Sequence, residues 1–252
     1  MAKIIINADD FGLSESVNTA IIEAFKKGYI TNTTLMVNMP GTEDAVKRAK
    51  ELGLWDRVGL HLNLYEGVPL NNKLKSFDEV LGEDKQLTYW THGLLRFYLG
   101  RRLLKEVKNE IELQITRFLD FDPICMHVDS HGHSHTNYSV WRLCKPLFVN
   151  HGFISTRLAR NLYVSCGVDI REGYKNLYNS DVRRSFQFNT DYFGGFSDFK
   201  SMMETDSKNF ETDCIVELMC HPIYEEGKLV NKGNLDFFEV LEFVELFNKD
   251  KF

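Results

Sequence analysis

The stretch KIIINADDFGLSESVNTAIIEAFKKG, residues 3–28, decides the fold class because it contains one complete strand-to-helix unit. Residues 3–8 form an apolar run with the length of a buried strand, and two aspartates follow it. Gly28 is placed to end a helix whose apolar residues recur at helical spacing: Val17, Ala20, Ile21, Ala24 and Phe25. This segment predicts a β-strand, a loop that carries carboxylates, and an amphipathic helix.

The same alternation of apolar runs and helical patterns continues along the chain. It predicts further strands and helices, the strands at 33–37, 58–63, 124–129, 154–157 and 215–220 and the helices at 42–52, 103–119, 140–149 and 235–247. Alternation of this kind favours parallel βα units. So many units favour a barrel over an open sheet, and no glycine-rich phosphate loop follows the first strand, which argues against a Rossmann fold. We therefore predict an α/β fold, a (β/α) barrel that is a distorted TIM-like barrel.

Two long regions, residues 65–102 and 158–213, do not fit this alternation. They are mixed in character, with aromatic residues and glycines scattered through them. We predict that they are insertions at the carboxyl-terminal rim of the barrel, where long loops often shape a substrate pocket. Peripheral decoration is the alternative for either loop. All residues, 1–252, are expected to form a single domain.

The composition is that of an ordinary globular protein, with 43% hydrophobic residues, 26% charged residues and a formal net charge of -6. This charge argues against a nucleic-acid partner, which needs a basic face. No apolar run approaches the roughly 18 residues of a membrane-spanning helix, so no membrane partner is expected. The five cysteines are scattered without a C-x-x-C pair, which favours reduced thiols. We expect a cytoplasmic protein and leave open whether it forms a homodimer.

Four of the eight histidines fall in one nine-residue stretch, HVDSHGHSH at 127–135. Imidazoles and carboxylates are the ligands and proton carriers of hydrolytic metal sites. A single buried histidine is usually a satisfied core group, but burying so many titratable groups without partners would cost several kcal/mol. The cluster therefore favours a metal site. His92 and His151 show no such context, and His135 is undecided.

The predicted strands share a second feature, which is one apolar face and one face that becomes polar near the carboxyl end. This follows from the alternation of side chains along a strand. In a parallel barrel all of these ends meet at one rim, where active sites form. The pattern therefore predicts that six side chains converge: Asp9, Asp10, His61, Asp129, His131 and His221.

At these residues the chain resembles the YdjC-like carbohydrate deacetylases. Five family motifs are matched in order and spacing, by NADDFGLS at 7–14, TNTTLMVNMP at 31–40, GLHLNL at 59–64, HVDSHGHSH at 127–135 and MCHP at 219–222. The resemblance implies a hydrolase that uses a metal to release acetate from an N-acetylated amino sugar or short oligosaccharide. One departure is visible. Gly132 stands where the family usually has a histidine, so the contact made by that histidine is not carried over.

The resemblance also implies roles for individual residues. One divalent metal ion, with Mg²⁺ or Zn²⁺ expected, would be held by Asp10, His61 and His131. On chemical grounds Asp9 is the candidate general base, and His221 is the candidate acid that protonates the leaving amine. The residues expected to bind substrate or to orient the metal ligands are Asn63, Asp129, His133 and Arg157.

Several alternatives stay open at the level of sequence. Asn63 either contacts sugar hydroxyls or caps a strand end, and Arg157 either pairs with Asp9 or binds substrate. A non-catalytic sugar-binding or metal-binding protein on the same fold is the main rival function. A less favoured rival is an iron oxygenase with two histidines and one carboxylate, because such triads usually lie on a double-stranded β-helix rather than on βα units.

Overall fold

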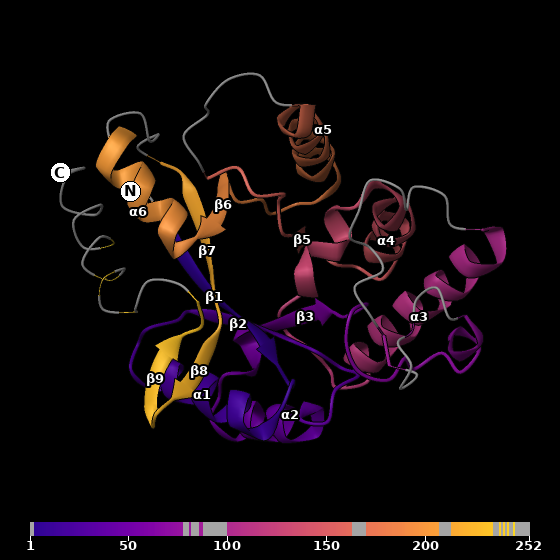
Figure 1. Cartoon of the computed structure of the whole chain (residues 1–252), viewed down its shortest axis with the longest axis horizontal. Coiled ribbons are helices and arrows are strands. Elements are labelled where there is room, and N and C mark those ends of the chain that lie inside the picture. Colours follow the sequence, from indigo (N-terminus) through magenta and orange to yellow (C-terminus); the bar gives the residue numbers. More distant parts are fainter. Residues whose placement is uncertain are drawn as a thin grey trace. The chain divides into compact units, whose positions relative to one another are not determined.

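The structure is a computed structural model that describes residues 3–77, 81, 86–87, 100–162, 170–206, 213–233 and the single positions 237, 239, 241 and 244 (Figure 1). A helix separates every pair of consecutive strands from β1 to β7. In chain order the elements are β1 (Lys3–Phe11), α1 (Glu15–Lys26), β2 (Asn32–Leu35), α2 (Thr42–Glu51), η1 (Trp55–Arg57), β3 (Val58–Leu62), η2 (Leu74–Ser76), α3 (Arg101–Leu119), β4 (His127–Ser130), η4 (His131–Thr136), α4 (Tyr138–Asn150), β5 (Ser155–Thr156), α5 (Ile170–Ser185), β6 (Tyr192–Gly195), α6 (Phe196–Asp206), β7 (Ile215–Cys220), β8 (Pro222–Glu225) and β9 (Lys228–Asn231).

Seven of these strands form one sheet in the order β5-β4-β3-β2-β1-β7-β6. The pairs β1–β7, β3–β4 and β6–β7 are parallel, and β8 and β9 form a separate antiparallel hairpin. The strands from β1 to β5 are neighbours in chain order, as expected for successive βα units. This arrangement confirms the predicted α/β fold class.

The chain divides into two compact units. Unit 1 comprises Met1–Asp9, Thr19–Thr33 and Ser155–Phe252, and unit 2 comprises Asp10–Asn18 and Thr34–Ile154. The expectation of one domain over residues 1–252 stays a prediction.

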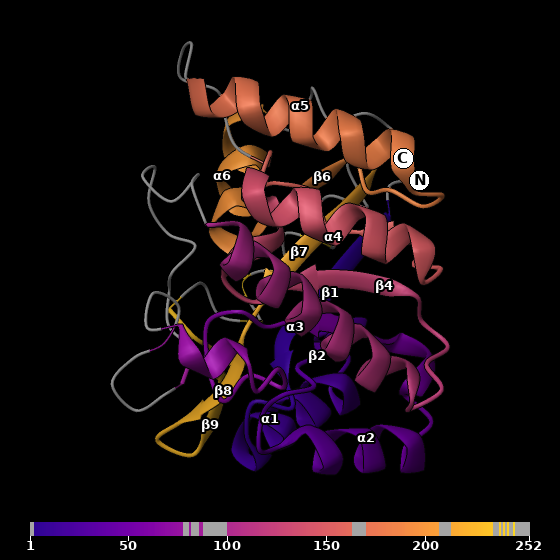
Figure 2. The ribbon, with the colours of Figure 1, turned by 90° about the vertical axis from the view of Figure 1, so that its right-hand side faces the viewer.

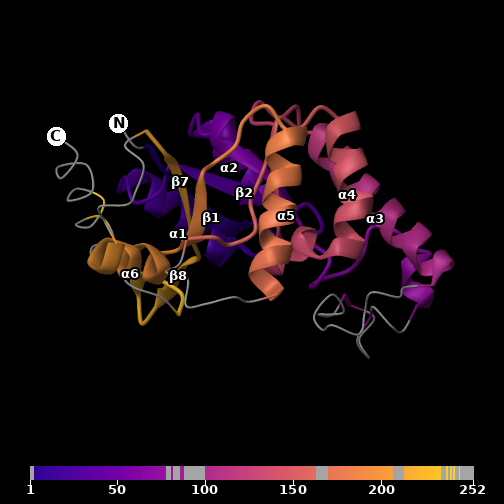
Figure 3. The ribbon, with the colours of Figure 1, turned by 90° about the horizontal axis from the view of Figure 1, so that it is seen from above.

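In unit 1 the core forms around β7. This strand runs alongside β1, in a register that pairs Lys3 with Ile215 and Ala8 with Cys220 (Figure 3). Helix α6 packs against β6 and β7. The middle of β7 is buried, and Glu217 is buried there together with its apolar neighbours Val216 and Leu218. Burial of each large apolar side chain contributes about 1.5–3 kcal/mol, and the buried set includes Phe193, Phe196, Phe199, Val216 and Leu218.

In unit 2 the pairing of β3 with β4 sets the positions of the polar residues. The register places Leu60 beside Val128, His61 beside Asp129 and Leu62 beside Ser130. Helix α3 packs against β3 and α4, and Figure 2 shows α3 and α4 side by side. Buried residues of α3, such as Ile111, Ile115 and Phe118, cover this part of the sheet. A polar pair, His61 and Asp129, is therefore held between buried apolar residues.

Most predicted elements are present with boundaries shifted by a few residues. The region 158–213 was expected to interrupt the strand–helix alternation, but it contains α5, β6 and α6 and so continues it. Strand β6 is only four residues long and two of them are glycines, which leaves almost no strand pattern to detect. Most of the predicted helix at 235–247, and most of residues 78–99 in the other region, lie outside the described residues. Among the described helices, none has the length and apolar character needed to cross a bilayer.

Candidate active site

Asp10 stands in unit 2 at the end of β1, where the backbone leaves the strand conformation. Its φ of 69° lies in the left-handed region, which a residue other than glycine rarely occupies. The turn is closed by a hydrogen bond from the Leu13 N–H to the Asp10 carbonyl, at 3.0 Å. A conformation of this kind costs about 1–3 kcal/mol and is common at functional sites, where the surroundings hold it in place.

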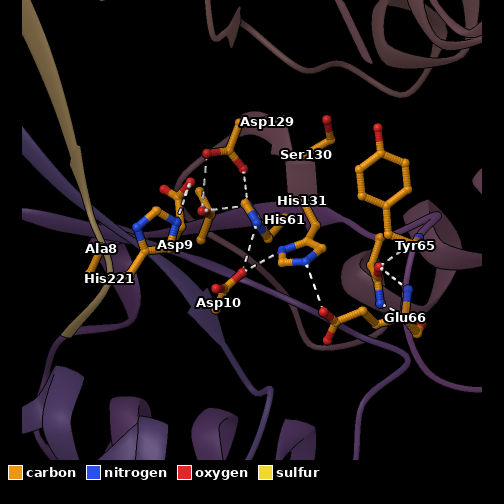
Figure 4. Close-up of polar contacts among 12 residues, drawn as sticks. Ala8, Asp9, Asp10, His61, Tyr65, Glu66, Asp129, Ser130, His131 and His221 are labelled. Carbon is orange, nitrogen blue, oxygen red and sulfur yellow. Dashed lines mark hydrogen bonds and ion pairs between the residues drawn. The ribbon is translucent and has the colours of Figure 1, made fainter. Parts of the chain in front are cut away.

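The Asp10 carboxylate lies between two imidazoles (Figure 4). Its Oδ1 atom is 3.2 Å from Nε2 of His61 and 2.7 Å from Nδ1 of His131. The three candidate ligand atoms all lie within 4.8 Å of one another. One carboxylate oxygen and two imidazole nitrogens form a donor set that suits Zn²⁺ and related divalent cations. The three side chains predicted as metal ligands are thus brought together, and their chemistry fits one divalent cation.

The orientation of His61 is set by the strand next to it. Asp129 Oδ1 is 2.6 Å from His61 Nδ1, and the hydroxyl of Thr34 donates to Asp129 Oδ2 at 3.1 Å. An ionised carboxylate only accepts hydrogen bonds, so Nδ1 of His61 carries a proton, and Nε2 is the nitrogen that faces Asp10. A carboxylate behind a metal-binding histidine acts in this way in many metal sites. This geometry supports the predicted orienting role of Asp129.

The electrostatics of the pair formed by Asp10 and His131 favour the charged form of both groups. Burial would raise the pKa of Asp10, but hydrogen bonds from His131 and His61 hold it well below its usual value. Burial would lower the pKa of His131, but hydrogen bonds to Asp10 and Glu66 outweigh this and raise it to about 9. Without metal, His131 is therefore protonated at neutral pH, and it must release that proton to bind a cation.

In unit 1, Asp9, Arg157 and His221 lie together. The Arg157 guanidinium donates to both oxygens of Asp9, at 2.7 Å each, and its Nε donates to Glu217 at 2.6 Å. Arg157 is fully buried, and its guanidinium lies 4.8 Å from the ring centre of Phe193. Of the two roles considered for Arg157, the geometry favours pairing with Asp9. Nε2 of His221 is 4.0 Å from Asp9 Oδ2 (Figure 4).

Glu217 is a buried charged residue that was not among the predicted site residues. Its signal was a carboxylate inside an otherwise apolar strand, on the same strand face as His221. A buried carboxylate needs a partner, and Arg157 supplies one. Glu217 thus fixes the guanidinium that in turn holds Asp9.

Asn63 lies directly after β3 and is completely buried. Its Oδ1 accepts hydrogen bonds from the N–H groups of Tyr65 and Glu66, and its Nδ2 donates to the Glu66 carbonyl and to Asn38. These bonds close a turn at the end of the strand. Of the two roles considered for Asn63, the geometry favours the strand-end role.

The histidine cluster continues beyond His131 in η4. His133 is half-buried and has a left-handed backbone, with a φ of 55°. Its role toward ligands or substrate stays a prediction. His135 is buried, and both its Nδ1 and its backbone N–H contact the Ser130 hydroxyl, at 2.5 and 2.9 Å. His135 therefore fixes the loop that carries His131.

Gly132 has a steric reason to lack a side chain. Its φ is 57°, and an added Cβ would lie 1.8 Å from a ring carbon of Tyr65. The Tyr65 hydroxyl donates to the Gly132 carbonyl at 3.3 Å. The tyrosine ring therefore occupies the space that a side chain at position 132 would need.

We expect Gly132→Ala to destabilise the protein more than a matched glycine change. It adds overpacking against Tyr65, about 1–3 kcal/mol, to the left-handed backbone cost of about 1 kcal/mol. Gly152→Ala is the control, because Gly152 has a φ of 80° but no atom near its added Cβ. Chemical denaturation measures both variants. Equal losses of unfolding free energy in the two variants would contradict the packing explanation. In a protein that already carries Tyr65→Ala, adding Gly132→Ala should cost no more than Gly152→Ala does.

The sequence and the fold are similar to those of known proteins. The family described as YdjC-like protein matches residues 3–242. A carbohydrate deacetylase of Clostridium beijerinckii is 32% identical over an alignment of 257 positions, which covers 98% of this chain and 92% of that protein. A carbohydrate deacetylase of Halalkalibacterium halodurans is 31% identical, with 97% of each chain covered. A solved structure from Enterococcus faecalis is described as a cellobiose-phosphate cleavage protein, a function that is itself unproven. It has a TM-score of 0.66 at 23% identity, over 89% of this chain and 82% of that one. At this identity the likeness shows the fold alone.

Proposed function

This chain belongs to the YdjC-like protein family, and we propose that it hydrolyses the N-acetyl group of an amino sugar or short oligosaccharide with the help of one divalent cation. The observation that carries the proposal is the donor set formed by Asp10, His61 and His131. The curated relatives that cover nearly the whole chain are carbohydrate deacetylases, which supports the same reaction.

Hydrolysis of an amide requires a better electrophile and a better nucleophile than the amide carbonyl and neutral water. A divalent cation bound by Asp10, His61 and His131 would polarise the acetyl carbonyl and make water more acidic. The donor set has two imidazoles and one carboxylate, so we propose Zn²⁺ or Mg²⁺ as the metal, with Zn²⁺ the better match for nitrogen ligands.

We propose that Asp9 accepts the proton from the attacking water. The peptide bond between Asp9 and Asp10 keeps the proposed base one residue away from a proposed ligand. Arg157 and Asn7 donate hydrogen bonds to the Asp9 carboxylate, which holds it in one orientation. An ionised carboxylate with a fixed direction meets the geometric demand on a general base.

We propose that His221 supplies the proton that the departing amine needs when the C–N bond breaks. Imidazole is the side chain best suited to giving up and regaining a proton near neutral pH. Its side chain is 27% exposed, so the imidazole can exchange protons with solvent between turnovers. The reaction then balances, with one water consumed and acetate and a free amine released.

An acetate-release assay tests the proposal. The purified protein is stripped with a chelator, reloaded with Zn²⁺, Mg²⁺, Mn²⁺, Co²⁺ or Ni²⁺, and incubated with N-acetylglucosamine and short chitooligosaccharides. We expect acetate release with at least one metal and a return to the background rate after chelation, because no residue replaces the cation.

The assay also separates the rival functions. Sugar binding without acetate release under any metal would support a non-catalytic protein. Turnover under anaerobic conditions without a co-substrate would exclude an oxygenase. A cytoplasmic location and a homodimer stay predictions.

A further inference from the structure

Glu66 faces His131 on the side opposite to Asp10. Nδ1 of His131 is 2.7 Å from Asp10, while its Nε2 is 3.4 Å from Glu66 Oε1 (Figure 4). The other imidazole has the reverse arrangement, because His61 Nε2 faces Asp10 and its Nδ1 faces Asp129. Each imidazole therefore has a carboxylate of its own behind it, but the two rings present different nitrogens to Asp10.

We propose that Glu66 is a positioning residue that makes Nδ1 the metal-binding nitrogen of His131, whereas His61 binds through Nε2. A carboxylate accepts a hydrogen bond but donates none, so Glu66 keeps the proton of a neutral His131 on Nε2 and leaves the Nδ1 lone pair free. This inference rests on the proposed metal site, and it assigns a role to a residue outside the predicted ligand set.

The turn after β3 holds Glu66 in place. The buried Asn63 side chain accepts from the Glu66 N–H at 3.1 Å and donates to the Glu66 carbonyl at 2.9 Å. The backbone of Glu66 is thus fixed at both of its polar groups. Such support is needed, because a glutamate on a loose segment would lose conformational entropy on pairing with the imidazole.

Tyr65 contacts the same histidine from another side. Its ring meets the His131 ring edge-on, with centres 6.0 Å apart and planes at 77°. The ring is 3% exposed and fits only because Gly132 carries no side chain. Two consecutive residues of one turn, Tyr65 and Glu66, therefore restrict the ring of His131.

Glu66 differs from Asp129 in exposure, and this sets the expected size of its effect. The Asp129 side chain is completely buried and 2.6 Å from its histidine, whereas the Glu66 side chain is 34% exposed and 3.4 Å away. Water competes for an exposed ion pair and weakens it. Loss of an outer carboxylate typically weakens metal binding about 10–100-fold, so we expect about 10-fold for Glu66.

The test measures the Zn²⁺ affinity of the full chain by competition with a chelator. Glu66→Met removes the acceptor and should weaken binding about 10-fold, whereas Glu66→Gln keeps an acceptor oxygen and should bind within about 3-fold of the wild type. Glu43→Gln is the control, because Glu43 is 71% exposed and pairs with Arg117 instead. Equal losses for Met and Gln would indicate a general charge effect and overturn the positioning role. An unchanged affinity in Glu66→Met would also overturn it.

A second measurement reads the nitrogens directly. ¹⁵N NMR of the Zn²⁺-loaded protein should show one liganding imidazole protonated on Nδ1 and one protonated on Nε2. Two imidazoles protonated on the same nitrogen would overturn the inference. A protein that shows the two tautomers with Zn²⁺ but releases no acetate would leave this inference standing and contradict the proposed function.

Discussion

Replacing His131 with alanine should abolish both the binding of a divalent metal and the release of acetate. The substitution removes one of three candidate ligands and leaves the Asp10 carboxylate beside a single imidazole. Changes to outer residues cost about 10–100-fold in metal affinity, and loss of a direct ligand should exceed that range. Calorimetric titration with Zn²⁺ and an acetate assay on the same sample measure the two losses together.

The control for this variant is His151→Ala. His151 follows α4, and it is its backbone N–H that caps the helix, so an alanine keeps that hydrogen bond. Circular dichroism of both variants shows whether the fold is intact. A folded His131→Ala protein that kept the wild-type metal affinity and turnover would show that the ligand assignment is wrong.

The residues of the candidate metal site were predictable because each ends or follows an apolar run. Asp10 follows the first run, and His61 and His131 fall in or just after two later ones. The alternation of side chains along each strand separates an apolar face from a face that becomes polar near the carboxyl end. In a parallel sheet the carboxyl ends of the strands lie at the same edge, so the polar residues there come together. The pairing of His61 with Asp129 then depends on one register, that of β3 with β4.

The contacts of the loops were not predictable from the sequence in the same way. Glu66 reaches His131 across 65 positions of the chain, and no periodicity in a loop marks a contact of that kind. Gly132 was noted as a departure from the family pattern, but its reason, the Tyr65 ring, is a steric fact that only coordinates reveal. Strand β6 was not predicted for a related reason, since two glycines in four residues remove the side chains on which the pattern depends.

The role of Arg157 was left open for a different physical reason. An arginine at the end of a strand can bind substrate or a neighbouring carboxylate, and the sequence contains many carboxylates. The structure shows it with two of them, Asp9 and Glu217, and with no exposed surface. Desolvation makes such a buried cation costly unless both partners are present, so this network is expected to respond strongly when either is changed.

Asp9→Asn should lower the rate of acetate release by at least roughly 10²-fold while leaving metal binding intact. An amide cannot accept the proton from water, and a general base typically contributes about 10²–10⁴-fold. Zn²⁺ stoichiometry should stay at the wild-type value, because Asp9 is not one of the three proposed ligands. The amide also offers Arg157 one acceptor oxygen in place of two, which destabilises the protein, so the rate is measured well below the unfolding temperature of the variant.

Asp120→Asn, an exposed change at the end of α3, is the matched control and should keep the wild-type rate. A near-normal rate for a folded, metal-loaded Asp9→Asn protein would show that another group takes the proton.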